Sequence, residues 1–389
     1  MKSSLSLLFF ISCTSLVCLL SCKPSGQEEP GTGAGAAKLR VYAGTASGHA
    51  DSAIFQFSLD PGSGAMQLQA VYGGVMNPSF LTISPTGTQL YCVHTLDAKP
   101  SGGIAAFAME GETGALSLLN SRSSGGNGPC YISTAGGGKW VLAANYSSGS
   151  VVVYATEKDG SLGEMSSLVQ HQGSGPDSSR QEGPHAHFVR QGTGGWIYAA
   201  DLGTDKVMLY QLGEKGELRP HDPPFLQLAP GSGPRHLDFH PNGRFVYVLN
   251  ELSGTVTAFA YSDSGFQLIQ TISSLPDGFE GYNKSADIHI HPSGKFLYAS
   301  NRGDYDSIAA FEIDEASGRL RLIEHEREGI VWPRNFGIEP GGACLLVANK
   351  NDHSIISFLI DPDTGALQPT SHRLDVPTPM CIQFMPESL

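Results

Sequence analysis

The sequence predicts an all-β fold, a seven-bladed β-propeller with four antiparallel strands in each blade. The main observation is a repeat, because residues 233–251 read as strand, turn and strand, and close copies of this segment run along the chain. The prolines that end four of the first strands, Pro241, Pro292, Pro340 and Pro386, are 51, 48 and 46 residues apart, about the length of one blade. The 48 Gly and 24 Pro residues at turn positions and a 40% hydrophobic content agree with one compact β domain.

The repeats define the blades in order. Copies open near residues 78, 129, 184, 234, 286, 333 and 379, and each continues with an alternating run, such as 255–261, and a weaker fourth run. The last copy has only its first strand before Leu389. Residues 39–44 and 52–59 match the second and third strands of a repeat, so we expect the N-terminal strands to complete the C-terminal blade and close the ring. No segment longer than one or two turns reads as an amphipathic helix.

The first 37 residues are of a different kind. Residues 1–22 read as a signal peptide with an apolar run from Leu5 to Leu20, and Leu19–Cys22 resembles the lipobox of bacterial lipoproteins, in which the cysteine carries lipid. Residues 23–37 would then be a flexible tether, and residues 38–389 the propeller. This predicts a protein anchored in the bacterial cell envelope through Cys22, facing the periplasm or the exterior; the alternative is a cytoplasmic protein with an apolar leader.

Cysteine content and charge limit the other partners. After processing, Cys92, Cys130, Cys344 and Cys381 remain, on predicted strands of different blades, where we expect free thiols that pack as small apolar residues. The formal net charge of −13, with no basic stretch, argues against nucleic acid. No cofactor or metal is expected, because there is no CxxC zinc pattern and the alternating pair His289 and His291 is explained by polar spacing near a turn. The oligomeric state stays open.

Strand geometry brings distant residues to one end of the channel. In an antiparallel hairpin, residues equidistant from the turn face each other, which pairs Arg235 with Glu251 about Gly243. The same symmetry about residue 193 pairs His185 with Asp201, and His187 lies two residues along the same strand face.

Two further blades add basic side chains to this end. The symmetry places Arg302 opposite Ala286 and Lys350 opposite Arg334. We therefore expect one rim of the channel to gather a set of charged and polar side chains: Arg235, Arg302, Arg334, Lys350, His185, His187, Asp201 and Glu251.

Such a rim suits the hydrolysis of a lactone. Ring opening needs a general base to activate water, positive groups where the carbonyl oxygen gains charge, and a proton donor for the leaving alkoxide. Glu251 or His187 would be the base, with Arg235 beside the oxyanion. An adjacent arginine favours the ionised carboxylate and weakens it as a base, whereas histidine has the more suitable ordinary pKa.

The repeats resemble those of a known family. Residues 183–187, 233–251, 296–303 and 333–350 are similar to the seven-bladed propeller lactonases, that is, 6-phosphogluconolactonases and the related carboxymuconate cyclases, over about residues 38–386. The resemblance implies hydrolysis of a sugar lactone, with 6-phosphogluconolactone of the pentose phosphate pathway as the expected substrate. It also implies a catalytic group: His185 or His187, Arg235, Glu251 and Arg302. Independently of the resemblance, Arg302, Arg334 and Lys350 suit a phosphate or carboxylate on the substrate, and Asp201 is a further expected substrate contact.

Other interpretations of these residues stay open. Arg235 and Glu251 also suit a structural ion pair, and one of the two histidines also suits a purely hydrogen-bonding role. Because 6-phosphogluconolactone is a cytoplasmic intermediate, either the leader is not an export signal or the natural substrate is a different lactone outside the cytoplasm. The competing function is an exported, non-catalytic propeller that binds a glycan or a protein partner at the same mouth.

Overall fold

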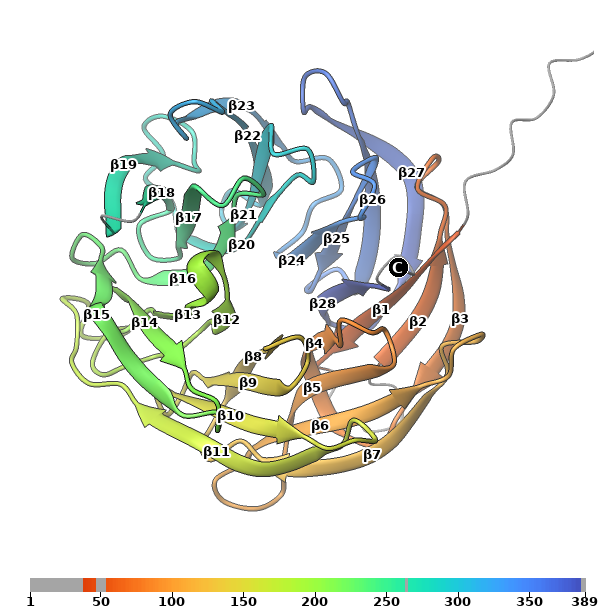
Figure 1. Ribbon diagram of the computed structural model, residues 1–389. Coiled ribbons are helices and arrows are strands. Elements are labelled where there is room, and N and C mark those ends of the chain that lie inside the picture. The colour runs from red at the N-terminus through yellow and green to blue at the C-terminus, as the bar shows by residue number, and fades with distance from the viewer. Residues whose placement is uncertain (1–37, 47–53, 263–264, 386–389) are drawn as a thin grey trace, which may run out of the picture. The chain divides into compact units, whose positions relative to one another are not determined.

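Seven four-stranded antiparallel sheets surround one central axis (Figure 1), as the sequence predicts. The structure of the protein is a computed structural model that describes residues 38–46, 54–262 and 265–385. The predicted signal peptide, the lipidation residue Cys22 and the tether of residues 23–37 lie outside the described residues. Within those ranges the only helical element is the short 3-10 turn Thr193–Gly195, and no helix is long and apolar enough to cross a membrane.

The first and second strands of the blades lie nearest the axis (Figure 1). The first strands are β4 (Met76–Ile83), β8 (Pro129–Ala135), β12 (Arg190–Gln191), β16 (Pro234–Phe239), β20 (Asn283–Ile290), β24 (Pro333–Ile338) and β28 (Pro379–Phe384). The second strands are β5 (Gln89–Thr95), β9 (Trp140–Asn145), β13 (Ile197–Asp201), β17 (Phe245–Asn250), β21 (Phe296–Gly303), β25 (Cys344–Asn349) and β1 (Leu39–Thr45).

The third and fourth strands form the outer part of each blade. The third strands are β6 (Gly102–Met109), β10 (Ser150–Thr156), β14 (Lys206–Leu212), β18 (Thr255–Ser262), β22 (Ser307–Ile313), β26 (Ser354–Ile360) and β2 (Ile54–Leu59). The fourth strands are β7 (Leu116–Ser123), β11 (Leu162–Gln170), β15 (Leu218–Gln227), β19 (Gly265–Ser273), β23 (Leu320–Glu326), β27 (Leu367–Asp375) and β3 (Met66–Tyr72).

The ring closes through the two ends of the propeller. Strand β28 pairs with β1, with Val41 opposite Phe384, and the sheet order is β28-β1-β2-β3. The expectation that N-terminal strands complete the C-terminal blade is therefore confirmed. This arrangement joins the ends of the ring by backbone hydrogen bonds.

Burial follows strand position in the blade. The second strands β9, β17 and β25 are buried at every residue, because both of their faces pack against neighbouring blades. The outermost strand β27 instead alternates between exposed and partly buried residues, as expected for a strand with one solvated face. The predicted alternating run at 255–261 forms the third strand β18, which is buried from Val256 to Phe259.

Repeated polar contacts hold neighbouring blades together. The second-strand tyrosines Tyr91, Tyr247 and Tyr298 each donate a hydrogen bond to a glycine carbonyl of the next blade, at 2.9, 3.0 and 2.8 Å. The asparagine near the end of a second strand contacts the preceding blade: Asn301 Nδ2 donates at 2.7 Å to the carbonyl of Ser274, which follows the last strand of that blade. Its role is structural.

The blade that opens at residue 184 departs from the repeat. Its first strand β12 has two residues, and the only pairing closer to the mouth is an isolated bridge between Ala186 and Asp201. Residues 171–185 form an irregular segment there, which places side chains at the mouth of the channel.

Candidate functional site

Register shifts in the first strands aim side chains at the mouth of the channel. In β8, β16 and β24 the pairing with the second strand shifts directly after the leading proline, which leaves Cys130, Arg235 and Arg334 as the extra residue of a bulge. Cys130 and Arg334 line a cavity at the mouth, and Arg235 forms an ion pair with Glu251, which also lines it.

This mouth cavity has a volume of about 400 Å³. The loops before first strands and the ends of second strands contribute its walls. Most of its lining side chains are basic or aromatic: Tyr146, Arg180, His187, Lys284, Arg302, Trp332, Arg334 and Lys350. The rest of the lining is Gly128, Cys130, Ser147 and Glu251. One carboxylate thus faces five cationic side chains in the lining.

Glu251 is held by three arginines. It follows the last residue of β17, and its Oε2 lies 2.9 Å from Arg235 Nε and 3.2 Å from Arg302 Nη2, while Oε1 lies 2.6 Å from Arg180 Nη2. Burial alone would raise the pKa of Glu251, but attraction by Arg302, Arg235 and Arg180 outweighs it and lowers the pKa to about 2. Glu251 is therefore ionised at neutral pH and a poor proton acceptor.

His187 is the histidine that lines the cavity. Its side chain is buried, and its Nδ1 has no hydrogen-bond partner among the described residues. Burial, and then the positive charge of Arg235, lower the pKa of His187 well below its usual value, so the imidazole is neutral at pH 7. A neutral imidazole with an unpaired ring nitrogen is suited to accepting a proton.

His185 has a structural environment. Both of its ring nitrogens have partners, Tyr146 O at 3.0 Å and Glu182 Oε1 at 3.1 Å, and its ring stacks on Tyr146 with centroids 4.5 Å apart. It is not among the residues that line the mouth cavity. The geometry therefore favours His187 over His185 as the histidine of the candidate catalytic group, a choice that the sequence left open.

Asp201 also lies away from the cavity lining. Its fully buried carboxylate accepts the backbone N–H of His185 at 2.9 Å and contacts His171 Nδ1 at 2.6 Å. The predicted proximity of His185 and Asp201 is confirmed, although the backbone bridge joins Asp201 to Ala186. Asp201 orders the irregular segment before β12, and it is not among the residues that line the mouth cavity.

The expected register of Arg302 is wrong by two residues. Arg302 pairs with Lys284 and not with Ala286. The hairpin pairs His289 with Tyr298, one residue from the predicted symmetry, and the irregularity between Ser285 and Ile288 adds one further residue to β20. Lys350 likewise bonds through its backbone N–H to Trp332 O, at 3.2 Å, and Arg334 is the bulged residue. Arg235, Arg302, Arg334 and Lys350 nevertheless gather at one rim, as predicted.

Several residues of the mouth cavity were not predicted from the sequence. Arg180 comes from the irregular segment between β11 and β12, where no periodicity marks its direction. Lys284 precedes the bulge in β20, and Trp332 and Tyr146 lie just outside strands. Only the alignment of X-Pro pairs, which places Trp332 directly before Pro333, offers a sequence signal for any of them.

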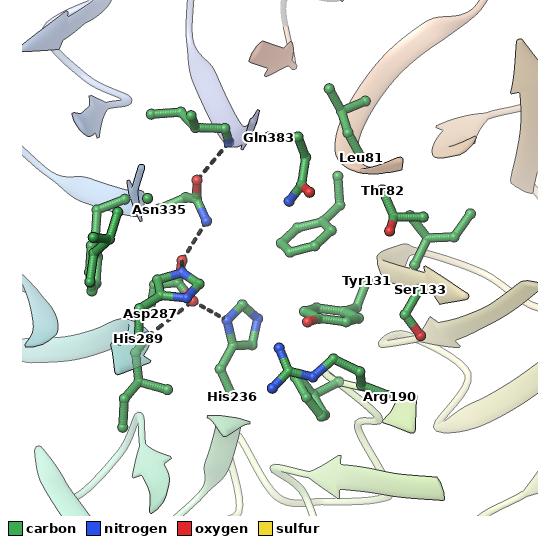
Figure 2. A pocket seen from close by; sticks show the side chains of 18 of the residues that line it. Leu81, Thr82, Tyr131, Ser133, Arg190, His236, Asp287, His289, Asn335 and Gln383 are labelled. Atoms are coloured by element: carbon green, nitrogen blue, oxygen red, sulfur yellow. Dashed lines mark hydrogen bonds and ion pairs between the residues drawn. The ribbon is translucent and has the colours of Figure 1, made fainter. Parts of the chain in front are cut away.

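A second cavity, of about 290 Å³, lies in the channel among the first strands (Figure 2). At its centre Asp287 accepts from His236 Nδ1 at 2.6 Å and His289 Nε2 at 3.1 Å, and it also bonds Asn335. Asp287 raises the pKa of His289 against the effect of burial. Among the described residues there is no group of three or more His, Cys, Asp or Glu side chains that could hold a metal ion.

Comparison with known proteins identifies the family. The profile described as "Lactonase, 7-bladed beta-propeller" matches residues 40–384. The chain belongs to this lactonase family. It is 35% identical to the 6-phosphogluconolactonase of Bacillus subtilis (strain 168) over 349 residues, which cover 88% of this chain and 97% of that protein.

Solved structures of similar lactonase-family propellers agree with this placement. The crystal structure described as the periplasmic gluconolactonase of Pseudomonas aeruginosa aligns with a TM-score of 0.84 at 31% identity, covering 90% of this chain and 99% of that one. A structure from Bacteroides fragilis NCTC 9343 aligns with the same TM-score at 37% identity, covering 92% of this chain and all of that one. The lactonase fold is thus shared along the propeller.

Proposed function

We propose that this lactonase hydrolyses 6-phosphogluconolactone to 6-phosphogluconate at the mouth cavity. The observation that carries the proposal is the excess of positive charge there: within the described residues no ion pair neutralises Arg334, Lys350 or Lys284. Burial, and then repulsion from Arg235, lower the pKa of Arg334 to about 10, so it stays protonated at neutral pH. A phosphate or carboxylate group would relieve this repulsion.

His187 is the proposed general base. It takes a proton from water as the water oxygen bonds to the lactone carbonyl carbon, and the resulting imidazolium then protonates the ring oxygen as the acyl–oxygen bond breaks. The low pKa of His187 keeps it in the basic form but weakens it as an acceptor. An anionic substrate beside Arg235 and Arg334 would reduce their positive field and raise that pKa again.

Glu251 has a different proposed role. Its ionised carboxylate holds Arg302 and Arg235 by contacts of 3.2 and 2.9 Å, so their guanidinium groups keep fixed positions in the mouth. Arg302 also donates from Nε to Lys284 O at 3.0 Å. Guanidinium groups fixed in this way stabilise the negative charge that develops on the carbonyl oxygen without reorganisation during the reaction.

The relatives support this reaction and differ over the phosphate. The Bacillus subtilis relative is named a 6-phosphogluconolactonase, whereas the Pseudomonas aeruginosa structure is named a gluconolactonase. The three unneutralised cations favour the phosphorylated substrate here. A non-catalytic propeller that binds a glycan or a protein partner is the alternative, and the same assay decides between them.

The test measures hydrolysis of both lactones by the full-length protein in mild detergent, corrected for spontaneous opening. We expect kcat/KM to be higher for 6-phosphogluconolactone, and Lys350→Ala to lower it for that substrate while leaving the neutral lactone within about twofold. Lys295→Ala, which removes an exposed lysine beside the Gly294 turn, is the matched control. Equal rates on both lactones would refute the phosphate assignment, and no rate above background would favour the binding module.

We also propose that the protein is anchored in the cell envelope through Cys22, in which case it acts on lactone that is present outside the cytoplasm. The leader and lipobox-like residues 19–22 support this, as does the periplasmic relative named above. Radiolabelled palmitate should enter the wild-type protein in growing bacteria, and Cys22→Ala should abolish both labelling and membrane association. A wild-type protein that stays unlabelled in the soluble cytoplasmic fraction would contradict this location.

A further inference from the structure

Trp332, which lines the mouth cavity, has an unusual backbone conformation. Its φ is 51°, in the left-handed region, where a bulky side chain is a clear outlier. The conformation belongs to a repeated position, because several first strands open on a residue–proline pair whose first residue has positive φ. These residues are Asn77, Gly128, Gly233, Trp332 and Thr378.

The choice of residue at this position is informative. Glycine and asparagine tolerate the left-handed region, and they occupy the position at Asn77, Gly128 and Gly233. Trp332 and Thr378 are the departures. Of the two, Trp332 lines the mouth cavity and Thr378 does not. Backbone strain therefore coincides with the proposed substrate site, where strained residues cluster in proteins.

Hydrogen bonds hold the backbone of Trp332 beside the strand ends that carry Arg302 and Lys350. Its N–H donates to Asp306 Oδ2 at 2.7 Å, and the other carboxylate oxygen of Asp306 accepts the N–H of Gly303, next to Arg302, at 2.8 Å. The carbonyl of Trp332 accepts the N–H of Lys350 at 3.2 Å. These bonds hold the backbone of Trp332 next to the residues that carry the positive charge of the mouth.

The indole thus lies among cations. The guanidinium carbon of Arg302 is 6.0 Å from the centre of the indole ring, and Arg334, two residues further on, shares the cavity wall. An aromatic face beside anion-binding groups matches the two parts of a sugar acid or its lactone. The sugar ring carries polarised C–H groups, which an electron-rich aromatic face attracts. The phosphate or carboxylate substituent on that ring is anionic and suits the basic side chains.

We propose that Trp332 is the platform on which the sugar-lactone ring stacks, and that it helps to determine specificity for a ring bearing an anionic group. This inference rests on the proposed lactonase function and extends it. The indole contributes a large contact area from a rigid side chain. The strained position places the indole in the same cavity wall as Arg302 and Lys350.

Stability separates this role from a structural one. Asparagine suits the left-handed conformation, so Trp332→Asn should unfold at the same temperature as the wild type or higher, while its KM rises on the order of tenfold. Trp332→Phe keeps an aromatic face and should keep KM within about threefold. A purely structural tryptophan would give the reverse for asparagine, with a lower unfolding temperature and an unchanged KM.

Tryptophan fluorescence reports directly whether a ligand contacts Trp332. The chain has three tryptophans, and the other two lie outside the mouth cavity: Trp140 is buried in β9, and Trp196 donates to Tyr261 Oη at 3.1 Å. Titration with 6-phosphogluconate, the stable product, should change tryptophan emission in the wild type and in Trp196→Phe. The change should disappear in Trp332→Phe, even though that variant still turns over substrate.

The outcomes test the role of Trp332 separately from the proposed lactone hydrolysis. Wild-type hydrolysis with a product-induced signal that persists in Trp332→Phe, or with an unchanged KM in Trp332→Asn, would overturn the platform and leave the lactonase reaction standing. A signal that depends on Trp332 in a protein that hydrolyses neither lactone would retain the ring-binding role and overturn the proposed reaction. Absence of both signal and hydrolysis would overturn both.

Discussion

The charge cluster at Glu251 makes a quantitative prediction about stability. Replacing Glu251 by glutamine keeps the shape of the side chain but leaves three arginines beside a neutral amide. The fall of the Glu251 pKa from an ordinary 4.5 to about 2 corresponds to about 3 kcal/mol of preference for the ionised form. We therefore expect Glu251→Gln to destabilise the protein by about 3 kcal/mol at pH 7, since a buried charge that loses its partner is strongly destabilising.

Thermal and pH-dependent unfolding measure this effect. From average unfolding entropies, a propeller of this length loses roughly 1.4 °C of Tm per kcal/mol, so Tm should fall by about 4 °C. Because the pKa of Glu251 is lower in the folded state, its contribution is complete above pH 4.5 and is lost as pH falls from 4.5 towards 2. The difference between wild type and Glu251→Gln should shrink to zero over that range.

A matched control removes an exposed pair. Glu312 contacts Arg321 on the outer part of a blade, with side chains 46% and 75% exposed, so Glu312→Gln should change stability by less than about 1 kcal/mol. If Glu251→Gln is as stable as Glu312→Gln, or if its deficit persists unchanged at pH 2, the three-arginine interpretation is refuted.

Other substitutions separate catalysis from structure. His187→Gln should lower kcat by 10²- to 10⁴-fold in the steady-state assay. His185→Gln should keep kcat within about tenfold, because the His185 ring has only structural partners. The opposite ranking would make His185 the general base. Because the His187 pKa lies well below 6.5, kcat/KM should be level from pH 6.5 to 8 and fall only in acid; a rise through pH 6.5 would contradict this. Asp201→Asn should lower Tm by a few degrees through its buried contact with His171 and leave KM within about twofold, and a large KM change would return Asp201 to the substrate site.

The fold was largely predictable because its information is local and repeated. Each repeat contains its own apolar runs, turn glycines and prolines, so the blade count and the closure by β1 and β28 follow from patterns within about 50 residues. The cysteines behaved mostly as expected: Cys92, Cys344 and Cys381 are buried free thiols, whereas Cys130 is partly exposed at the mouth.

The candidate site was predictable in part. The contact between Arg235 and Glu251 and the gathering of basic residues at one rim were predicted. The register behind that prediction was wrong by two residues, because Glu251 pairs through its backbone with Gly233 and Arg235 is the extra residue of the bulge. The strand residue that pairs with Arg302 could not be predicted, because a bulge in β20 changes the register and the sequence pattern does not indicate it. Arg180 was missed for a related reason, since it lies in an irregular segment whose course is set by contacts with other blades.

The sequence by itself determined the architecture, the family and the end of the channel where charge gathers, because strand periodicity and turn chemistry act over neighbouring residues. Only the tertiary structure decided which groups meet at the mouth and in what protonation state. Glu251 becomes a fixed anion, and His187 rather than His185 becomes the neutral, unpaired imidazole, through burial and through charges that three other segments supply. Electrostatic effects of this kind depend on distance in space, and Glu251 contacts Arg180 and Arg302 across 71 and 51 positions of the chain.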